Sequence, residues 1–250
     1  MNTGNRSTST LLQGLVFDVD GTLADTEMAH MAAFNRAFAE LGLDWHWEVT
    51  LYTQLLEVSG GKERIRHFAD RTKPQDWMIL TPRGRDDLVK RLHELKTRAY
   101  EEAVHAGQVP MRHGVLELIE DARREGVRLA IATTTSTANI EALLGRALGS
   151  NWRQVFDVVE DASTAPIKKP HPQVYVQALQ RLGLMGYQCW AIEDSSNGVQ
   201  AARAAQMPVL VTPNVFTVKH NLGPAHRVIP SLEGVSVYTL RAWHAQAISK

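Results

Sequence analysis

The sequence has little of several features that mark specialised classes of protein. Its 250 residues include one cysteine, Cys189, which excludes an internal disulfide and indicates a reducing compartment. Lys+Arg and Asp+Glu both total 27, and this lack of excess charge gives no indication of a nucleic-acid or membrane partner. The apolar runs are of strand length and too short to cross a bilayer. We therefore expect a cytoplasmic protein with neither kind of partner, and we take a monomer as its expected state.

What is present is the composition of a globular protein, with 44% hydrophobic and 22% charged residues. Residues 1–10 (MNTGNRSTST) are polar and lack the apolar segment of a secretion signal, so we expect a disordered tail there. A hydrophobic strand is expected within residues 11–19 (LLQGLVFDV). The region that follows has no convincing strand; its helical periodicity predicts helices near residues 28–41, 62–70 and 84–105, with Pro74 and Pro82 interrupting the middle.

After Pro110 the pattern changes to helices that alternate with strands. Helices are expected at residues 114–125, 137–148, 172–182 and 198–205, and strands at residues 127–132, 155–159, 189–192 and 209–211. This alternation predicts an α/β fold, a Rossmann-like parallel sheet with helices on both faces. We assign residues 11–26 and 108–250 to this core and residues 27–107 to an all-helical insertion directly after the first strand.

Polar side chains follow the expected strands. In open parallel sheets the ligand site lies beyond the carboxyl ends of the strands. The residues at these ends are two acids one residue apart, a run of hydroxyls, a lysine and a second acidic pair: Asp18 and Asp20, Thr133 to Ser136, Lys169, and Glu193 with Asp194. Alone, each group has an ordinary explanation as a turn, a solvated loop or a charge pair at the start of a helix. Their occurrence together, each after a strand, favours a functional site.

This set of residues suits phosphoryl transfer to a carboxylate. Asp18 and Asp20 leave the strand on the same side, and such a pair is costly unless a cation or proton lies near it. An aspartate such as Asp18 can attack phosphorus and form an aspartyl-phosphate. The incoming phosphate adds about −1.5 to −2 of charge, so we expect Mg²⁺, with Asp18, the Asp20 carbonyl and Asp194 as ligands and Glu193 as a further candidate. Asp20 would then serve as general acid and base.

The remaining strand-end residues complete this scheme. Lys169 would balance the charge of the phosphoryl oxygens, and Thr133 with the amide that follows would hydrogen-bond one of them without adding charge. Thr134 and Thr135 are included among the expected substrate contacts.

The same residues resemble a known family. Residues 18–23 (DVDGTL), Thr133, residues 169–170 (KP) and residues 193–195 (EDS) look like the four motifs of the haloacid dehalogenase-like phosphohydrolases. The insertion after the first motif resembles the helical cap of the β-phosphoglucomutase-like branch. Residues 59–65 (SGGKERI), 132–136 (ATTTS) and 168–170 (KKP) are similar to the CbbY-type phosphatases associated with Calvin-cycle operons. At residues 112–114 the chain has Arg-His-Gly where relatives often carry Arg-Pro-Gly.

The resemblance implies removal of one phosphate from xylulose 1,5-bisphosphate, an inhibitor of Rubisco. A bisphosphate needs a second anion site, and Gly60 and Gly61 leading into a helix with Lys62 and Arg64 would supply free N–H groups and cations. Glu27 and His30, one helical turn apart after the first motif, are expected to contact sugar hydroxyls. Tyr52 is a further candidate for substrate contact, and Trp45, Trp47 and Trp77 are expected to form the core of the cap.

Alternative functions remain open at this point. A β-phosphoglucomutase-like mutase uses the same aspartate and returns the phosphoryl group to the sugar, and a phosphatase of another small sugar phosphate has the same motifs. A phospho-accepting receiver domain also combines acids, Ser/Thr and Lys at strand ends, but is about half this length or less and has no large helical insertion.

Overall fold

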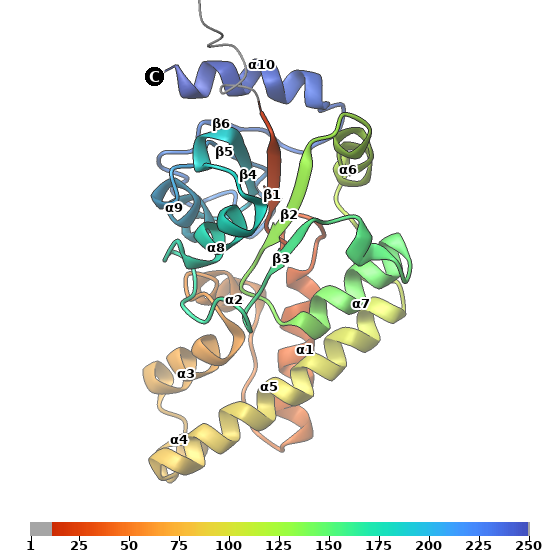
Figure 1. The fold of residues 1–250 in the computed structure, drawn as a ribbon. Helices are drawn as coiled ribbons and strands as arrows, with labels where there is room; N and C mark the ends of the chain where they lie inside the picture. The colour runs from red at the N-terminus through yellow and green to blue at the C-terminus, as the bar shows by residue number, and fades with distance from the viewer. Residues whose placement is uncertain (1–11, 250) are drawn as a thin grey trace, which may run out of the picture.

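A six-stranded parallel sheet forms the centre of the protein. The structure, a computed structural model, describes residues 12–249, so the whole of the expected disordered tail (1–10) lies outside the described residues. The strands are β1 (Gly14–Phe17), β2 (Arg128–Ala132), β3 (Val158–Glu160), β4 (Cys189–Glu193), β5 (Val209–Val211) and β6 (Arg227–Val228). Their order in the sheet is β3-β2-β1-β4-β5-β6, and every neighbouring pair is parallel (Figure 1). The predicted α/β fold with a parallel sheet is confirmed.

Strand β1 lies in the middle of the sheet and is buried on both faces. Phe17 is paired in register with Ile131 of β2 and Ile192 of β4. Successive side chains of a strand point to opposite faces, so Leu15 and Phe17 join one hydrophobic cluster while Val16 joins another. A strand buried in this way reads as a continuous apolar run in the sequence.

Helices cover both faces, as predicted. The side of Phe17 packs against α6 (Val115–Arg124), α7 (Thr137–Leu148) and α10 (Val237–Ile248), and the side of Val16 against α8 (Gln173–Leu182) and α9 (Ser196–Ala204). Figure 1 shows α10 lying at the end of the sheet away from the helical insertion. The helices therefore leave the carboxyl ends of β1, β2 and β4 facing that insertion.

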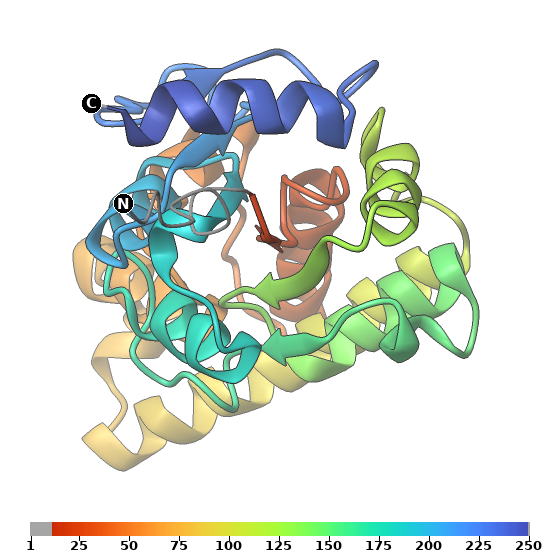
Figure 2. The same cartoon turned by 45° about the horizontal axis from the view of Figure 1, so that its top comes forward.

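The insertion between β1 and β2 is helical. It consists of α1 (Glu27–Glu40), α2 (Val49–Leu55), α3 (Gly61–Thr72), α4 (Gln75–Met78) and α5 (Pro82–His105). Its own core is rich in aromatic rings and includes Trp45, Trp47 and Trp77, as expected from the sequence. In Figures 1 and 2, α5 runs alongside α7 of the α/β core, and its residues Tyr100 and Val104 belong to the cluster beneath the sheet. The exact domain boundaries, 26/27 and 107/108, stay a prediction.

Several expected elements differ in the structure. The first strand has four residues and is shorter than expected, and the strand expected at 155–159 is Val158–Glu160 in the structure. Helix α5 begins at Pro82, two residues earlier than expected, because the first helical position tolerates a residue without an N–H; the Thr81 hydroxyl accepts a hydrogen bond from the Gly84 amide there (3.1 Å). The sequence has no clear helix or strand pattern in four further elements, which were not predicted: α2, α4, β6 and α10. Within residues 12–249, no helix combines the length and apolarity that a membrane span requires.

Candidate active site

The strand-end residues predicted from the sequence meet at one edge of the sheet. β1, β2 and β4 are neighbours, so Asp18, Thr133 and Asp194, which follow them, lie together. Oxygen atoms of Asp18, Glu193 and Asp194 all lie within 4.8 Å of one another, and the three residues are buried. Parallel strands that end at a common edge are sufficient to explain this convergence.

Lys169 connects two of these acids. Its Nζ donates to Asp18 Oδ1 (2.6 Å) and to Glu193 Oε1 (2.6 Å), and its side chain is buried. The loop between β3 and α8 carries it into the site, and its ammonium lies 4.9 Å from the centre of the Tyr175 ring. Burial lowers the pKa of Lys169, but the attraction of Asp18 and Glu193 outweighs this and holds the pKa above its usual value. Lys169 is therefore a fixed cation beside the expected nucleophile.

Glu193 is engaged by protein donors at both oxygens. The Tyr175 hydroxyl also donates to Oε1, and Oε2 accepts weaker contacts from the Asp194 amide (3.3 Å) and the Ser195 hydroxyl (3.5 Å). These contacts make Glu193 the partner that orients Lys169. Its expected role as a direct metal ligand stays a prediction.

The charges in this cluster fit a divalent cation. Burial raises the pKa of Asp18 to about 7, against the attraction of Lys169. Burial, with repulsion from Asp18 and Glu193, raises the pKa of Asp194 well above its usual value. One lysine does not offset three buried carboxyl groups, and carboxylate oxygens are the ligands that Mg²⁺ prefers. The donor set of Asp18 and Asp194 therefore suits Mg²⁺ or a similar ion.

Asp20 faces the helical insertion instead. Its Oδ1 is 2.9 Å from His30 Nε2, and the His30 ring stacks on Tyr100 with the ring centres 4.1 Å apart. Burial raises the pKa of Asp20, but His30 and the nearby Lys96 outweigh this and hold the pKa below its usual range. In this arrangement Asp20 is in the base form. His30 thus contacts a catalytic candidate in the structure, in addition to its expected place near the substrate.

The loop after β2 supplies the hydroxyl groups. The Thr133 side chain is buried, and its Oγ1 accepts a hydrogen bond from the Thr135 amide (3.3 Å). Asn139 donates to Thr135 Oγ1 (2.8 Å), and the Ser136 hydroxyl caps the start of α7 by accepting from the Asn139 amide. The loop is therefore held by its own hydrogen bonds, with Thr133 and Thr134 on the wall of the site.

A cavity of about 580 Å³ lies between the sheet edge and the helical insertion. The expected site residues that line it come from both parts of the chain: Asp18, Asp20, Glu27, His30, Gly61, Lys62, Arg64, Thr133, Thr134, Thr135, Lys169 and Asp194. Glu193 and Tyr52 are not among the lining residues. This volume accommodates a small sugar phosphate.

Tyr52 lies beneath the cavity wall. Its ring is fully buried in the aromatic core of the insertion, and its hydroxyl donates to Glu27 Oε2 (2.8 Å) and accepts from Arg64 (3.2 Å). The expected direct contact of Tyr52 with substrate is therefore not what this structure shows: its hydroxyl is used to orient Glu27. Helix α2 has seven residues, too few for its hydrophobic periodicity to show that Tyr52 is buried.

A second group of cations lines the cavity at the start of α3 and in the loop before α8. Gly60 (φ 97°) precedes α3, whose first residues, Gly61 and Lys62, line the cavity, and Lys168 lines it from the core side. A positive φ at this position favours glycine. Arg64 lines the same wall, but donates to the carbonyl oxygens of Leu55 and Val58 within the insertion. The carboxylate of Glu63 lies against Gly60 and offsets part of this positive charge.

Sequence reasoning missed two residues of α5, His93 and Lys96, that line the cavity. Lys96 is 5% exposed, and its ammonium lies 5.3 Å from the ring centres of both Phe34 and Tyr100. Burial lowers the pKa of Lys96 to about 8. Helix α5 carries many basic residues, so nothing in the sequence separates this buried lysine from the solvated ones.

Replacing Lys96 with methionine is expected to stabilise the fold at neutral pH. The pKa of Lys96 falls from 10.5 to about 8, which corresponds to about 3 kcal/mol in favour of the unfolded state at pH 7. Because the unfolded chain holds the proton more tightly, this penalty is complete below pH 8 and disappears as the pH rises toward 10.5. Denaturant unfolding at pH 7 and pH 10 measures the difference.

The exposed Lys90 of the same helix supplies the control, since Lys90→Met removes the same charge from a solvated position. A Lys96→Met protein that is no more stable at pH 7, or a gain that does not shrink at pH 10, would contradict the assignment.

Comparisons with known proteins agree with this geometry. The family model described as haloacid dehalogenase-like hydrolase matches residues 12–206. The chain is 47% identical to the plasmid-encoded protein CbbY of Cupriavidus necator, over 93% of this chain and 97% of that protein. It is also 41% identical to protein CbbY of Rhodobacter capsulatus, over 92% and 97% of the two chains.

Solved structures show the same relationship. The crystal structure of CbbY from Rhodobacter sphaeroides in complex with phosphate has a TM-score of 0.82 and 37% identity, covering 90% of this chain and 96% of that one. A mutant of the same protein has been crystallised in complex with xylulose-(1,5)bisphosphate. The chain belongs to the haloacid dehalogenase-like hydrolases and is a phosphatase of that family.

Proposed function

We propose that this chain is a Mg²⁺-dependent sugar phosphatase that converts xylulose 1,5-bisphosphate to xylulose 5-phosphate and phosphate. The observation that carries the proposal is a cavity lined by two groups of cations: Lys169, which pairs with Asp18, and Lys62 with Lys168. The likeness to CbbY of Rhodobacter sphaeroides, whose mutant was crystallised with xylulose-(1,5)bisphosphate, supports this choice of substrate. The corresponding role is removal of an inhibitor of Rubisco.

The proposed reaction has two displacements at phosphorus. In the first, a carboxylate oxygen of Asp18 forms a bond to phosphorus while the bond from phosphorus to the sugar oxygen breaks, and Asp20 protonates the leaving alcohol. In the second, Asp20 takes a proton from water, the water oxygen bonds to phosphorus, and the bond to Asp18 breaks. In the structure the contact with His30 holds Asp20 in its base form. Asp20 must therefore give up this contact and take up a proton from solvent before the first displacement; it regains a proton from the attacking water in the second.

Other residues of the site bind and hold the groups that react. Lys169 and the Thr133 hydroxyl would contact phosphoryl oxygens, and Asp18 and Asp194 would hold Mg²⁺, which would neutralise charge between phosphate and nucleophile. The Asp20 carbonyl and Glu193 remain proposed ligands. Glu27, oriented by Tyr52, would accept hydrogen bonds from sugar hydroxyls. Monomeric state, cytoplasmic location and the lack of nucleic-acid or membrane partners also stay predictions.

A phosphate-release assay with Mg²⁺ tests the proposal. Xylulose 1,5-bisphosphate is expected to yield one phosphate per molecule and to react faster than xylulose 5-phosphate or hexose monophosphates. An isomerised sugar phosphate without free phosphate would indicate a mutase instead. Stable phosphorylation of Asp18 by a small donor, without turnover of any ester, would indicate a phospho-accepting module.

Replacing Lys62 with alanine is expected to affect the bisphosphate selectively. Lys62 lies at the start of α3 and lines the cavity near Lys168. Loss of one charge-assisted contact of about 1.5–3 kcal/mol should raise KM for the bisphosphate by about 10-fold to 150-fold. Hydrolysis of an aryl phosphate, which has one anionic group, should change by less than about threefold. Equal losses of activity toward the two substrates would contradict the assignment of Lys62 to the second anion site.

A further inference from the structure

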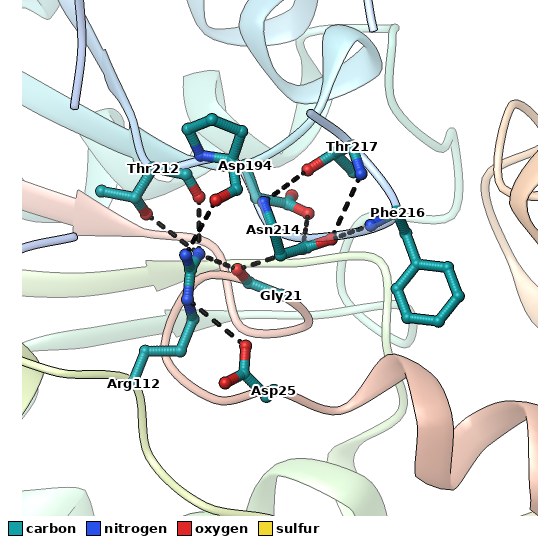
Figure 3. Close-up of polar contacts among 9 residues, drawn as sticks. Gly21, Asp25, Arg112, Asp194, Thr212, Asn214, Phe216 and Thr217 are labelled. Carbon is teal, nitrogen blue, oxygen red and sulfur yellow. Dashed lines mark hydrogen bonds and ion pairs between the residues drawn. The ribbon is translucent and has the colours of Figure 1, made fainter. Parts of the chain in front are cut away.

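The side chain of Arg112 joins the loop that follows β5 to the loop that follows β1. Arg112 donates to the carbonyl oxygens of Gly21, Thr212 and Pro213, and its Nε lies 3.4 Å from Asp25 (Figure 3). The guanidinium is largely buried, and its several N–H donors allow one side chain to join both loops. Residues 212–213 are therefore fixed relative to the turn that carries the catalytic aspartates.

Asn214, the next residue, uses both ends of its side-chain amide. Its Oδ1 accepts hydrogen bonds from the backbone amides of Phe216 (2.9 Å) and Thr217 (3.2 Å). Its Nδ2 donates to Asp194 Oδ2 (2.8 Å), as Figure 3 shows. Because only an oxygen can accept from two N–H groups, the turn itself determines which end of the amide faces Asp194.

The orientation of the Asp194 carboxylate depends on its hydrogen bond from Asn214. Within residues 12–249, Asn214 is the one residue whose hydrogen bond to the Asp194 carboxylate the structure shows. A methyl group on Gly21 would collide with both Asp194 Oδ2 and Asn214 Nδ2, so the three groups are tightly packed. The position of the carboxylate is thus set by a neutral donor on one oxygen, and the other oxygen remains for a ligand.

The far end of the turn is anchored in the helical insertion. Phe216 is 4% exposed and belongs to the aromatic cluster of the insertion, although it comes from the α/β core. Its ring meets that of Tyr52 edge-on, with centres 5.9 Å apart. The turn of residues 213–217 is therefore held by Arg112 on one side and by Phe216 on the other, and the direction of the Asn214 amide follows from both.

We propose that Asn214 is a positioning residue for the cation ligand Asp194. Its amide holds one carboxylate oxygen so that the other faces the divalent cation. This assignment rests on the metal site of the proposed function. Partners that hydrogen-bond a metal ligand typically contribute 10-fold to 100-fold to metal affinity. Neither the sequence motifs nor the strand-end pattern points to Asn214, because it lies in an irregular turn twenty residues beyond Asp194.

The variant Asn214→Ser separates this role from the structure of the turn. A serine hydroxyl can accept from the same backbone amides but is too short to reach Asp194. Asn221→Ser is the matched control, since the exposed Asn221 accepts from the Gly223 amide in a similar turn with no metal ligand nearby. We expect the Mg²⁺ dissociation constant of the substrate-free Asn214→Ser enzyme, measured calorimetrically, to rise about tenfold, with no change in the control.

Two further readouts distinguish positioning from folding. The melting temperature of Asn214→Ser without Mg²⁺ should match that of wild type, and kcat should recover when Mg²⁺ is raised to saturation. Unchanged Mg²⁺ affinity, equal weakening in both variants, or a lower melting temperature without Mg²⁺ would overturn the assignment. Wild-type enzyme that binds no Mg²⁺ would refute the proposed metal site as well, so the two failures are distinguishable.

Discussion

Replacing Asp18 with asparagine is expected to reduce turnover by at least about 10⁴-fold, since loss of a covalent nucleophile removes the reaction path itself. Asparagine has nearly the same shape, so the cavity and the contacts of β1 should persist. Burial already disfavours the charged form of Asp18 and raises its pKa to about 7. The free energy of unfolding should therefore stay within about 1 kcal/mol of wild type. Phosphate release and denaturant unfolding measure the two quantities.

Asp25→Asn is the matched control for this experiment. Asp25 lies in the same loop but its side chain is 57% exposed and its only described ion pair, with Arg112, is long (3.4 Å). Exposed pairs contribute little to stability. We expect near wild-type turnover from Asp25→Asn, and more than about 1% residual turnover in Asp18→Asn would contradict the role of Asp18 as nucleophile.

Replacing Lys169 with methionine is expected to impair both stability and activity. Lys169 lies between Asp18 and Glu193, each 2.6 Å away, and its side chain is 4% exposed. Removing one partner of a buried ion pair leaves uncompensated charge and typically costs about 3–5 kcal/mol. Loss of the same cation from the phosphoryl site should lower kcat/KM by about 10³-fold, comparable to removal of other electrostatic groups in active sites.

The pH dependence tests the electrostatic cause. The stability lost in Lys169→Met should shrink as the pH falls from 7 to 5, because Asp18, with a pKa that burial raises to about 7, can take up a proton in the folded state. Lys168→Met is the control for stability, since the neighbouring Lys168 is half-buried and ion pairs with neither acid. A stability loss in Lys169→Met that is equal at pH 7 and pH 5 would indicate a packing defect instead.

Local patterns were sufficient to predict the α/β core. Buried strands such as β1 read as continuous apolar runs, and the start of α7 at Thr137 and the extent of β5 follow directly from the change of periodicity. Strand β6 has two residues, too few to show any period, and α10 lies beyond the last strong strand. Such elements are stabilised by packing against the sheet, which a single sequence does not display.

The sequence alone determined the strand-end chemistry: Asp18, Asp20, Thr133, Lys169 and Asp194 follow strands of one parallel sheet, and the topology of such sheets brings those ends together. Only the tertiary structure decided which side chains from distant segments complete the site. Tyr52 turned out to support Glu27, Lys96 to be buried, and Asn214 to hold Asp194, because these contacts depend on how the insertion and the last loops pack against the sheet. Packing of this kind joins residues far apart in the chain, and no local period or motif encodes it.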